Sequence, residues 1–161
     1  MTMATADLCD AHPDAVALAP LFRDFGGSSA FHGQVATCKV FEDNALVRSL
    51  LETAGNARVL LVVDGGGSLR CALVGGMLAD LGVRNGWAGI VVYVCVRDCQ
   101  ELAAQSIGIK ALASHPRKSE KGLHGGAEGR VLEFAGARIA PDDWLYADVD
   151  GMVVASRALH V

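Results

Sequence analysis

The chain has 161 residues, of which 52% are hydrophobic and 20% are charged, and its formal net charge is −4. This length and balance predict one folded domain over residues 1–161 with a substantial core, and they exclude a disordered or fibrous chain. Because the acidic balance implies no broad basic surface, we expect no direct binding of nucleic acid.

The cysteines indicate a reducing compartment. Their number, 5, is odd, and no two of them form a C-x-x-C pair. Several lie in apolar runs, which is typical of buried thiols in a cytoplasmic protein. The N-terminus lacks the charged and then apolar pattern of a signal peptide, and no apolar run approaches the roughly 20 residues of a membrane helix. We therefore expect a cytoplasmic protein without membrane association.

Helix and strand patterns alternate in the first third of the chain. In chain order, the expected elements are a helix before Pro13, a turn over residues 16–21, a loop over residues 25–29, a strand over residues 31–41, and a helix from Asp43 or Asn44 to Gly55. The strand is inferred from partial alternation of apolar residues, and the second helix from apolar residues at helical spacing.

Two continuous apolar runs dominate the middle of the chain. Residues 58–64 and 89–96 have no polar face, which is typical of central strands covered on both sides. The other elements expected here are a glycine-rich turn over residues 65–67, helices over residues 68–74, 75–85 and 98–105, and a strand over residues 107–114. This alternation predicts an α/β core.

Short strands follow in the C-terminal part. Hairpins are expected over residues 131–140 and 144–155, with turns at Ala135-Gly136 and Asp150-Gly151. Before them, residues 115–130 form a polar, glycine-rich loop. Its basic residues are Arg117, Lys118, Lys121 and Arg130. Both a solvated loop and a docking surface for an acidic partner fit this pattern.

Gly75-Gly76-Met77-Leu78 is a candidate site for an anion. A helix that begins here leaves its first backbone amides unpaired and its positive dipole end exposed. Two glycines also remove the side chains that would block an approaching carboxylate. A glycine pair that serves helix packing explains the pattern equally well.

Arg97-Asp98 is the sharpest feature of the sequence, because two charges follow eight residues of buried strand. Such charges emerge at the end of the strand, since burial without a partner is too costly. Arg97 offers a planar fork for a carboxylate or a keto oxygen, and Asp98 offers an oxygen ligand for Mg²⁺ or Mn²⁺. The alternative is a capping role, in which Asp98 caps the helix that Glu101 enters.

The turn after residues 58–64 is a weaker candidate. Asp64 and three glycines lie between a strand and a helix, where α/β proteins often bind ligands. The spacing matches neither a dinucleotide fingerprint nor a P-loop, and an ordinary turn explains it as well. An S-adenosylmethionine methyltransferase is a third functional alternative here, but no second motif supports it.

At this point the ordered motifs resemble a known family, regulator of ribonuclease activity A (RraA), which also contains the 4-hydroxy-4-methyl-2-oxoglutarate aldolases. The resemblance covers nearly the whole chain. The matching stretches are residues 6–10, 41–44, 62–68, 72–76, 86–89, 97–98, 107–111, 116–119 and 145–151. It implies a swivelling β/β/α sandwich-like fold with a mixed central sheet, a β-rich C-terminal part and a homotrimer.

The same resemblance implies class II aldolase chemistry that forms a pyruvate enolate, with oxaloacetate decarboxylation as a side activity. Carried over by position, the amides of residues 75–78 hold the carboxylate of a keto acid, Arg97 binds that acid and stabilises the enolate, and Asp98 holds Mg²⁺ or Mn²⁺. The resemblance also implies a second role, in which the protein binds and inhibits ribonuclease E.

One position departs from the aldolase pattern. Aldolase members have an Asp, then 20 residues, then Arg-Asp and an acid after two more residues. Arg97, Asp98 and Glu101 match this pattern, but Gly76 stands in place of the first Asp. Gly76 therefore favours the ribonuclease regulator, while the other three residues favour the aldolase.

Overall fold

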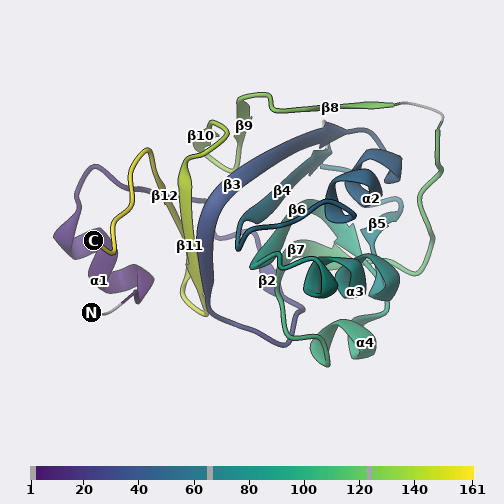
Figure 1. Cartoon of the computed structure of the whole chain (residues 1–161), viewed down its shortest axis with the longest axis horizontal. Helices are drawn as coiled ribbons and strands as arrows, with labels where there is room; N and C mark the ends of the chain where they lie inside the picture. The colour runs from purple at the N-terminus through teal and green to yellow at the C-terminus, as the bar shows by residue number, and fades with distance from the viewer. Residues whose placement is uncertain (1–2, 65–66, 123–124) are drawn as a thin grey trace.

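The structure is a computed structural model that describes residues 3–64, 67–122 and 125–161. Ten of its strands form one mixed sheet. They are β1 (Val16–Ala17), β2 (Arg23–Asp24), β3 (Phe31–Val40), β4 (Val59–Asp64), β5 (Ala72–Val74), β6 (Gly89–Val96), β7 (Gly108–Ser114), β8 (Gly126–Glu128), β11 (Trp144–Asp148) and β12 (Gly151–Ala155). Their main order is β1-β12-β11-β3-β4-β6-β7-β2, with β5 beside β6 and β8 beside β3. The sheet curls strongly (Figure 1).

The predicted α/β fold with a mixed central sheet is confirmed by the strand directions. Strands β3, β4, β6 and β7 pair in parallel, and β5 joins β6 in parallel as well. Antiparallel pairs extend the sheet at both ends. At one end β11 adjoins β3 and β12 adjoins β11, and at the other end β2 adjoins β7. The carboxyl ends of the four central strands therefore lie at a common edge of the sheet. The C-terminal strands β11 and β12 lie on the side of β3 that faces away from β4.

Two layers cover the central strands. On one face lie the helices α2 (Ala45–Leu51), α3 (Gly76–Arg84) and α4 (Cys99–Ala103). On the other lies the hairpin of β9 (Leu132–Phe134) and β10 (Ala137–Ile139). Alternate residues of β4 face these two cores, with Leu60 and Val62 toward the helices and Leu61 toward the hairpin. The continuous apolar runs of β4 and β6 follow from this double coverage.

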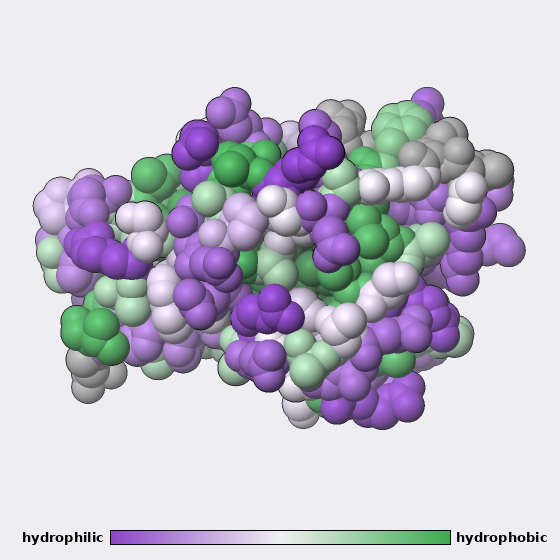
Figure 2. Space-filling model, turned by 45° about the horizontal axis from the view of Figure 1, so that its top comes forward, coloured by the Kyte–Doolittle hydropathy of each residue, from purple (hydrophilic) through white to green (hydrophobic). Residues whose placement is uncertain are grey.

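Helix α1 (Thr5–Ala11) covers the outer end of the sheet (Figure 1). Its Leu8 packs in a third cluster with Tyr146, Val153 and Leu159, so both ends of the chain meet beside β11 and β12. Polar residues cover most of the face shown in Figure 2, where a smaller hydrophobic area lies to the right of the centre. None of the described helices is long and apolar enough to cross a membrane.

Both predicted hairpins are present. Ala135 and Gly136 have φ values of 49° and 76°, the left-handed conformations that a tight two-residue hairpin turn requires. Asp148 pairs with Gly151 across the second turn. The strands expected over residues 31–41, 58–64, 89–96 and 107–114 correspond to β3, β4, β6 and β7.

Three predictions of local structure were wrong. Residues 72–74 form β5 rather than part of a helix, because all three are buried and leave no polar face for solvent. The turn expected over residues 16–21 begins with β1, which gains its backbone partners from β12. The polar loop over residues 115–130 contains β8, which pairs with β3. The glycine turn over residues 65–67 lies largely outside the described residues.

Candidate functional site

The parallel pairing of β5 with β6 brings the two candidate motifs together. Val74 aligns with Val96, so the residues that follow, Gly75 and Arg97, leave the sheet at the same edge. The Arg97 amide donates to the carbonyl of Val74 at 3.0 Å. The start of α3 and the Arg97-Asp98 pair therefore form a single site, at the carboxyl ends of strands where α/β sheets bind ligands.

Gly75 is required here by close packing. It precedes α3 with φ −131° and ψ −166°, extended backbone that any residue can adopt. A Cβ at this position would lie 2.7 Å from Oδ2 of Asp98 and 3.3 Å from Cγ of Arg97. The absence of a side chain at residue 75 therefore lets the Arg97-Asp98 backbone and side chains approach the beginning of the helix.

Asp98 adopts a strained conformation. It has φ 60° and ψ 44°, in the left-handed region that costs a non-glycine residue about 1 kcal/mol or more. Its side chain makes no capping bond to its own helix α4. Instead, Oδ2 accepts a hydrogen bond from the Gly76 amide at 2.9 Å. The capping alternative for α4 is thus not realised, and the carboxylate turns toward the N-terminus of α3.

This bond occupies one of the amides that the sequence assigned to substrate. The Gly76 amide is bound to Asp98. The amides of Met77 and Leu78 lie in the first turn of α3, where a helix supplies no acceptor of its own. Met77 and Leu78 are therefore the first-turn donors left for an anion, and the dipole of α3 favours negative charge beside them.

Glu101 fills the space above Gly76. A Cβ built on Gly76 would collide with the carboxylate of Glu101. The side chain of Glu101 comes from α4, one turn after Asp98, and both carboxylates thus gather at the positive end of α3. The departure from the aldolase pattern at residue 76 has a structural counterpart, because a carboxylate from another residue occupies the place beside it.

A cavity of about 380 Å³ opens at this edge. Five of the six predicted site residues line it, namely Gly75, Met77, Leu78, Arg97 and Asp98. Gly76 does not line it. The remaining wall includes side chains that the sequence did not predict for the site, namely Asn44, Arg48, Lys118, Ser119, Glu120 and Lys121. The cavity is thus wider than the predicted motif and carries both cationic and neutral polar groups.

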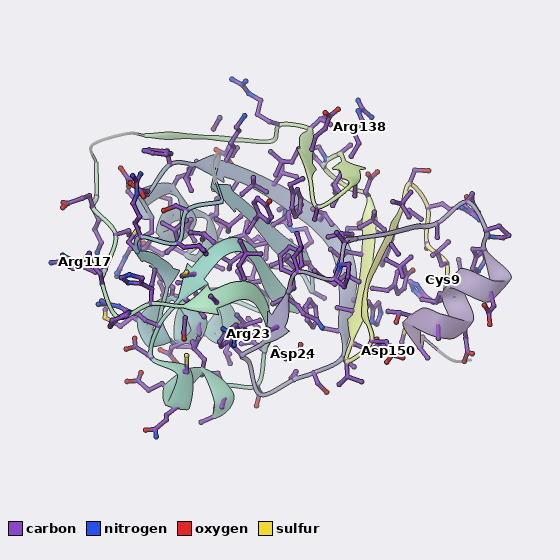
Figure 3. The ribbon with its side chains drawn as sticks, turned by 180° about the vertical axis from the view of Figure 1, so that it is seen from behind. Cys9, Arg23, Asp24, Arg117, Arg138 and Asp150 are labelled. Carbon is purple, nitrogen blue, oxygen red and sulfur yellow. The ribbon has the colours of Figure 1, made fainter. Side chains whose placement is uncertain are left out.

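The segment over residues 115–121, which we name the strap, supplies the last four of these groups. It leaves β7 and lies along β5, where the amide of Ala72 donates to the carbonyl of Arg117 at 2.8 Å. Lys118 pairs with Ala72, and Glu120 with Asp43, as isolated bridges. Figure 3 shows that the side chain of Arg117 points away from the body of the molecule. The sequence signals for the strap were its basic composition and the family match over residues 116–119, and neither placed it at the cavity.

Arg97 is free to bind an anion. Its side chain is half-buried, and its single hydrogen bond to a described residue is a long one of 3.4 Å from Nη1 to the carbonyl of Pro116. Among the described residues no carboxylate forms an ion pair with it. A guanidinium at a cavity wall without an acidic partner is suited to a carboxylate or an enolate oxygen of a ligand.

The residues also fit a loosely held divalent cation. The described part of the chain contains no group of three or more His, Cys, Asp or Glu side chains that could hold a metal. Asp98 is exposed, and of its two oxygens Oδ2 accepts the bond from Gly76. Mg²⁺ commonly binds through one or two carboxylates while keeping several waters. A ligand set of Asp98 Oδ1, waters and substrate oxygens matches this mode of Mg²⁺ coordination.

Comparison with known proteins gives a consistent result. A family model described as "RraA-like: Aldolase/RraA" matches residues 5–154. Proteins from Burkholderia mallei (strain SAVP1) and Burkholderia pseudomallei (strain 668) are 57% identical over 165 residues, covering 99% of this chain and of each relative. Both carry the name "Putative 4-hydroxy-4-methyl-2-oxoglutarate aldolase".

Two solved structures share the fold at a TM-score of 0.93. One is described as an S-adenosylmethionine: 2-dimethylmenaquinone methyltransferase from Geobacillus kaustophilus HTA426, with 44% identity over 98% of this chain and 97% of that one. The other is described as the RNA-processing inhibitor RraA from Thermus thermophilis, with 45% identity over 98% and 94%. The family match and these relatives each span nearly all of the chain, which therefore belongs to the RraA-like family.

Proposed function

We propose that the protein is a lyase that cleaves 4-hydroxy-4-methyl-2-oxoglutarate into two pyruvates, and that it decarboxylates oxaloacetate as a side activity. The observation that carries the proposal is the convergence of Arg97, Asp98 and the first turn of α3 on one cavity. The names of the Burkholderia relatives, at 57% identity, support the same reaction.

The keto-acid end of the substrate binds at the start of α3. The amides of Met77 and Leu78 donate to its carboxylate, which the helix dipole also stabilises. The guanidinium of Arg97 lies at the same cavity and donates to the neighbouring keto oxygen. This arrangement orients the bond between C3 and C4 and places a cation where negative charge develops.

The reaction moves an electron pair onto that oxygen. The C4 hydroxyl loses its proton, the C3–C4 bond breaks, and its electrons form the enolate of the first pyruvate while C4 becomes the keto carbon of the second. A proton added to C3 completes the first product. In oxaloacetate the same bond breaks with loss of CO₂, and the same enolate forms. Arg97 stabilises the enolate oxygen in both reactions.

Asp98 is the residue that would hold a divalent cation, through Oδ1 and bound waters. When bound, such a cation polarises the keto oxygen as a Lewis acid. The remaining role of Asp98 belongs to the chain itself. Its bond to the Gly76 amide fixes the carboxylate at the beginning of α3 and keeps it beside Arg97. No Schiff-base lysine is needed for this chemistry.

Glu101 is our candidate for handling the hydroxyl proton. Its carboxylate occupies the space beside Gly76, at the edge of the site. Through a bridging water it accepts the proton that leaves the C4 hydroxyl and returns a proton to C3. Decarboxylation of oxaloacetate has no hydroxyl proton to remove, so the two reactions depend on Glu101 to different degrees.

The test is release of pyruvate from both substrates, measured with Mg²⁺, with Mn²⁺ and with a chelator. We expect metal-dependent turnover that falls by about 100-fold or more in Arg97→Ala and in Asp98→Ala. Arg84→Ala is the matched control, because Arg84 is a solvent-exposed residue of α3 that pairs with Asp80 outside the cavity. Absence of turnover with either substrate would overturn the aldolase proposal.

A second candidate function is regulation of a ribonuclease of the E type by direct binding. It is favoured by the 45% identity to the Thermus protein that is described as an RNA-processing inhibitor. The net charge of −4 suits a protein partner better than RNA. A pull-down with ribonuclease E tests this, and no complex at micromolar concentration would contradict it. Arg97→Ala should bind as well as the wild type if the two functions use separate surfaces.

We further propose a cytoplasmic homotrimer. The five cysteines are all free thiols, which suits a reducing compartment. Leu69 and Met77 have exposed fractions of 59% and 70%, and a neighbouring subunit would cover such side chains. Light scattering gives the number of subunits. Methyltransferase activity is not part of the proposal, because no second motif in the sequence supports it.

A further inference from the structure

We propose that the strap and the start of α2 form a second subsite in the cavity, which binds the C4 hydroxyl and the distal carboxylate of a 4-hydroxy-2-oxo dicarboxylic acid. The residues of this subsite are Asn44, Lys118, Ser119 and Lys121. The inference rests on the proposed function, because it adds the far half of the substrate to a site that binds the keto-acid half.

The first observation is a buried hydroxyl without a partner. Ser119 lines the cavity and has an exposed fraction of 5%. Its Oγ has no hydrogen-bond partner among the residues that the structure describes. A buried hydroxyl is normally paired, because neither water nor protein otherwise compensates its lost solvation. A ligand that enters the cavity would supply the missing partner.

The second observation concerns an amide on the facing segment. Asn44 uses its Nδ2 to donate to the carbonyl of Leu73 at 3.1 Å, which fixes the orientation of the side chain. The other atom of that amide, Oδ1, is buried and has no partner within the described part of the chain. Oδ1 can only accept, so it requires a donor such as a hydroxyl group. Together, Ser119 and Asn44 offer a donor and an acceptor at one cavity.

The third observation is the charge of this wall. Lys118 and Lys121 line the cavity, and neither forms an ion pair with any described residue. Arg48 also lines it, although its guanidinium pairs with Glu52 at 3.2 Å. Glu120 is the acidic member of the strap on this wall. With Arg97 and α3 holding one carboxylate, two further lysines indicate a ligand that carries a second one.

These groups match the chemistry of one half of the proposed substrate. The bond that breaks lies between a keto-acid half and a half with a hydroxyl and a carboxylate on neighbouring carbons. The cavity of about 380 Å³ contains both sets of groups in a single space. A monocarboxylate such as pyruvate would occupy only the Arg97 end, which leaves the second subsite to decide between substrates.

The experiment separates the two ends by using two probes. Exchange of the pyruvate methyl protons with D₂O, followed by NMR in the presence of Mg²⁺, needs only the Arg97 end. Calorimetric binding of 2-oxoglutarate, which is not cleaved, also requires the second subsite. We expect Lys118→Ala to weaken 2-oxoglutarate binding and raise KM for the aldol substrate by about tenfold, while pyruvate exchange stays within about twofold. Lys39→Ala, an exposed lysine of β3 outside the cavity, is the control.

Ser119→Ala tests the hydroxyl with a second readout. We expect KM for the aldol substrate to rise about fivefold, with the melting temperature unchanged or higher, because an unpaired hydroxyl does not stabilise the fold. Ser106→Ala, an exposed serine outside the cavity, should change neither quantity. A fall in melting temperature without a change in KM would assign Ser119 a structural role and overturn its place in the subsite.

The outcomes distinguish this inference from the function on which it rests. If the wild type exchanges pyruvate protons but Lys118→Ala binds 2-oxoglutarate like the wild type and Ser119→Ala leaves KM for the aldol substrate unchanged, the second subsite is wrong and the aldolase proposal stands. If the wild type neither exchanges pyruvate nor cleaves the aldol substrate, the aldolase proposal fails. In that case a loss of 2-oxoglutarate binding in Lys118→Ala would still support a dicarboxylate subsite, and unchanged binding would overturn it.

Discussion

Two cavities of similar size differ in how well their polar groups are paired. The cavity beside α3 has a volume of about 380 Å³, and a second one, lined by His32, Trp144 and His160 among others, has about 410 Å³. The first contains Ser119 Oγ and Asn44 Oδ1 without partners. It also includes Asp98 in a strained conformation. Size alone would therefore favour the second cavity, which none of the proposed site residues lines.

The second cavity is bordered by an aromatic cluster in which the buried Tyr146 hydroxyl is paired. The Tyr146 hydroxyl accepts from the Leu159 amide at 2.8 Å and shares a hydrogen bond of 2.6 Å with Nδ1 of His160. His32 stacks on Tyr146 with ring centroids 5.7 Å apart. Because the Tyr146 hydroxyl is paired with Leu159 and His160, these contacts stabilise the C-terminal end of the chain. Unpaired polar groups and backbone strain, rather than volume, are therefore the features that distinguish the proposed site from the second cavity.

The largest effect that would sharpen this comparison is expected at Glu101. In Glu101→Gln the carboxylate beside Gly76 becomes an amide that cannot accept the hydroxyl proton. We expect turnover of 4-hydroxy-4-methyl-2-oxoglutarate to fall about 100-fold, and oxaloacetate decarboxylation to fall much less. Steady-state rates of pyruvate formation measure both. Equal losses for the two substrates would show that Glu101 does not handle the hydroxyl proton.

The next effect is expected from Gly75→Ala. Its Cβ would lie 2.7 Å from Oδ2 of Asp98, so the carboxylate must move and its bond to the Gly76 amide must lengthen. We expect both activities to fall about tenfold, because a small displacement of a positioning group lowers the rate strongly. Gly86→Ala is the control, because it strains the backbone but meets no neighbouring atoms. Residue 86 has φ 80° but no neighbour within 4 Å, so that change should strain the backbone without altering the site.

The aromatic cluster should respond in stability and not in activity. Tyr146→Phe removes the hydroxyl that pairs with the Leu159 amide and His160. We expect the free energy of unfolding to fall by about 1 kcal/mol, because the buried amide loses its acceptor. Urea denaturation measures the change. A loss of aldolase turnover in this variant would contradict the separation of the two cavities.

How far the sequence could predict the site follows from which contacts are local. Arg97 and Asp98 were predicted because their charges directly follow a buried strand, and the amides of Met77 and Leu78 because glycines precede them. Both inferences use neighbours in the chain. The α/β core followed in the same way from the apolar runs of β4 and β6, whereas the mixed central sheet was implied by the family resemblance.

Ser119 and Lys118 could not be placed from the sequence. They reach the cavity because the strap pairs with β5 at Ala72, more than forty positions earlier in the chain. The sequence pattern predicted a helix for residues 68–74, so no strand was expected for the strap to follow. The contact of Glu101 with Gly76 was missed for a similar reason. It joins α4 to α3, and these helices lie side by side because the strands before them, β6 and β5, pair in the sheet.

The smallest effect is a dependence of stability on pH that arises in the aromatic cluster. Burial lowers the pKa of His32 below its ordinary value of 6.5, and the neighbouring His160 lowers it further. The unfolded chain therefore binds a proton at a higher pH than the folded protein does. The contribution of neutral His32 to the free energy of unfolding is therefore complete above about pH 6.5, and it is lost as the pH falls through the lowered pKa of the folded state.

His32→Phe keeps an aromatic ring on Tyr146 but cannot bind a proton. We expect the melting temperature of the wild type to fall more steeply between about pH 7 and about pH 5 than that of this variant. Differential scanning calorimetry over this range gives both curves. Parallel curves would mean that His32 is neutral or charged alike in the folded and unfolded chain. A steeper wild-type curve would show that the second cavity is built to keep a neutral ring buried, in contrast to the charged groups left open beside α3.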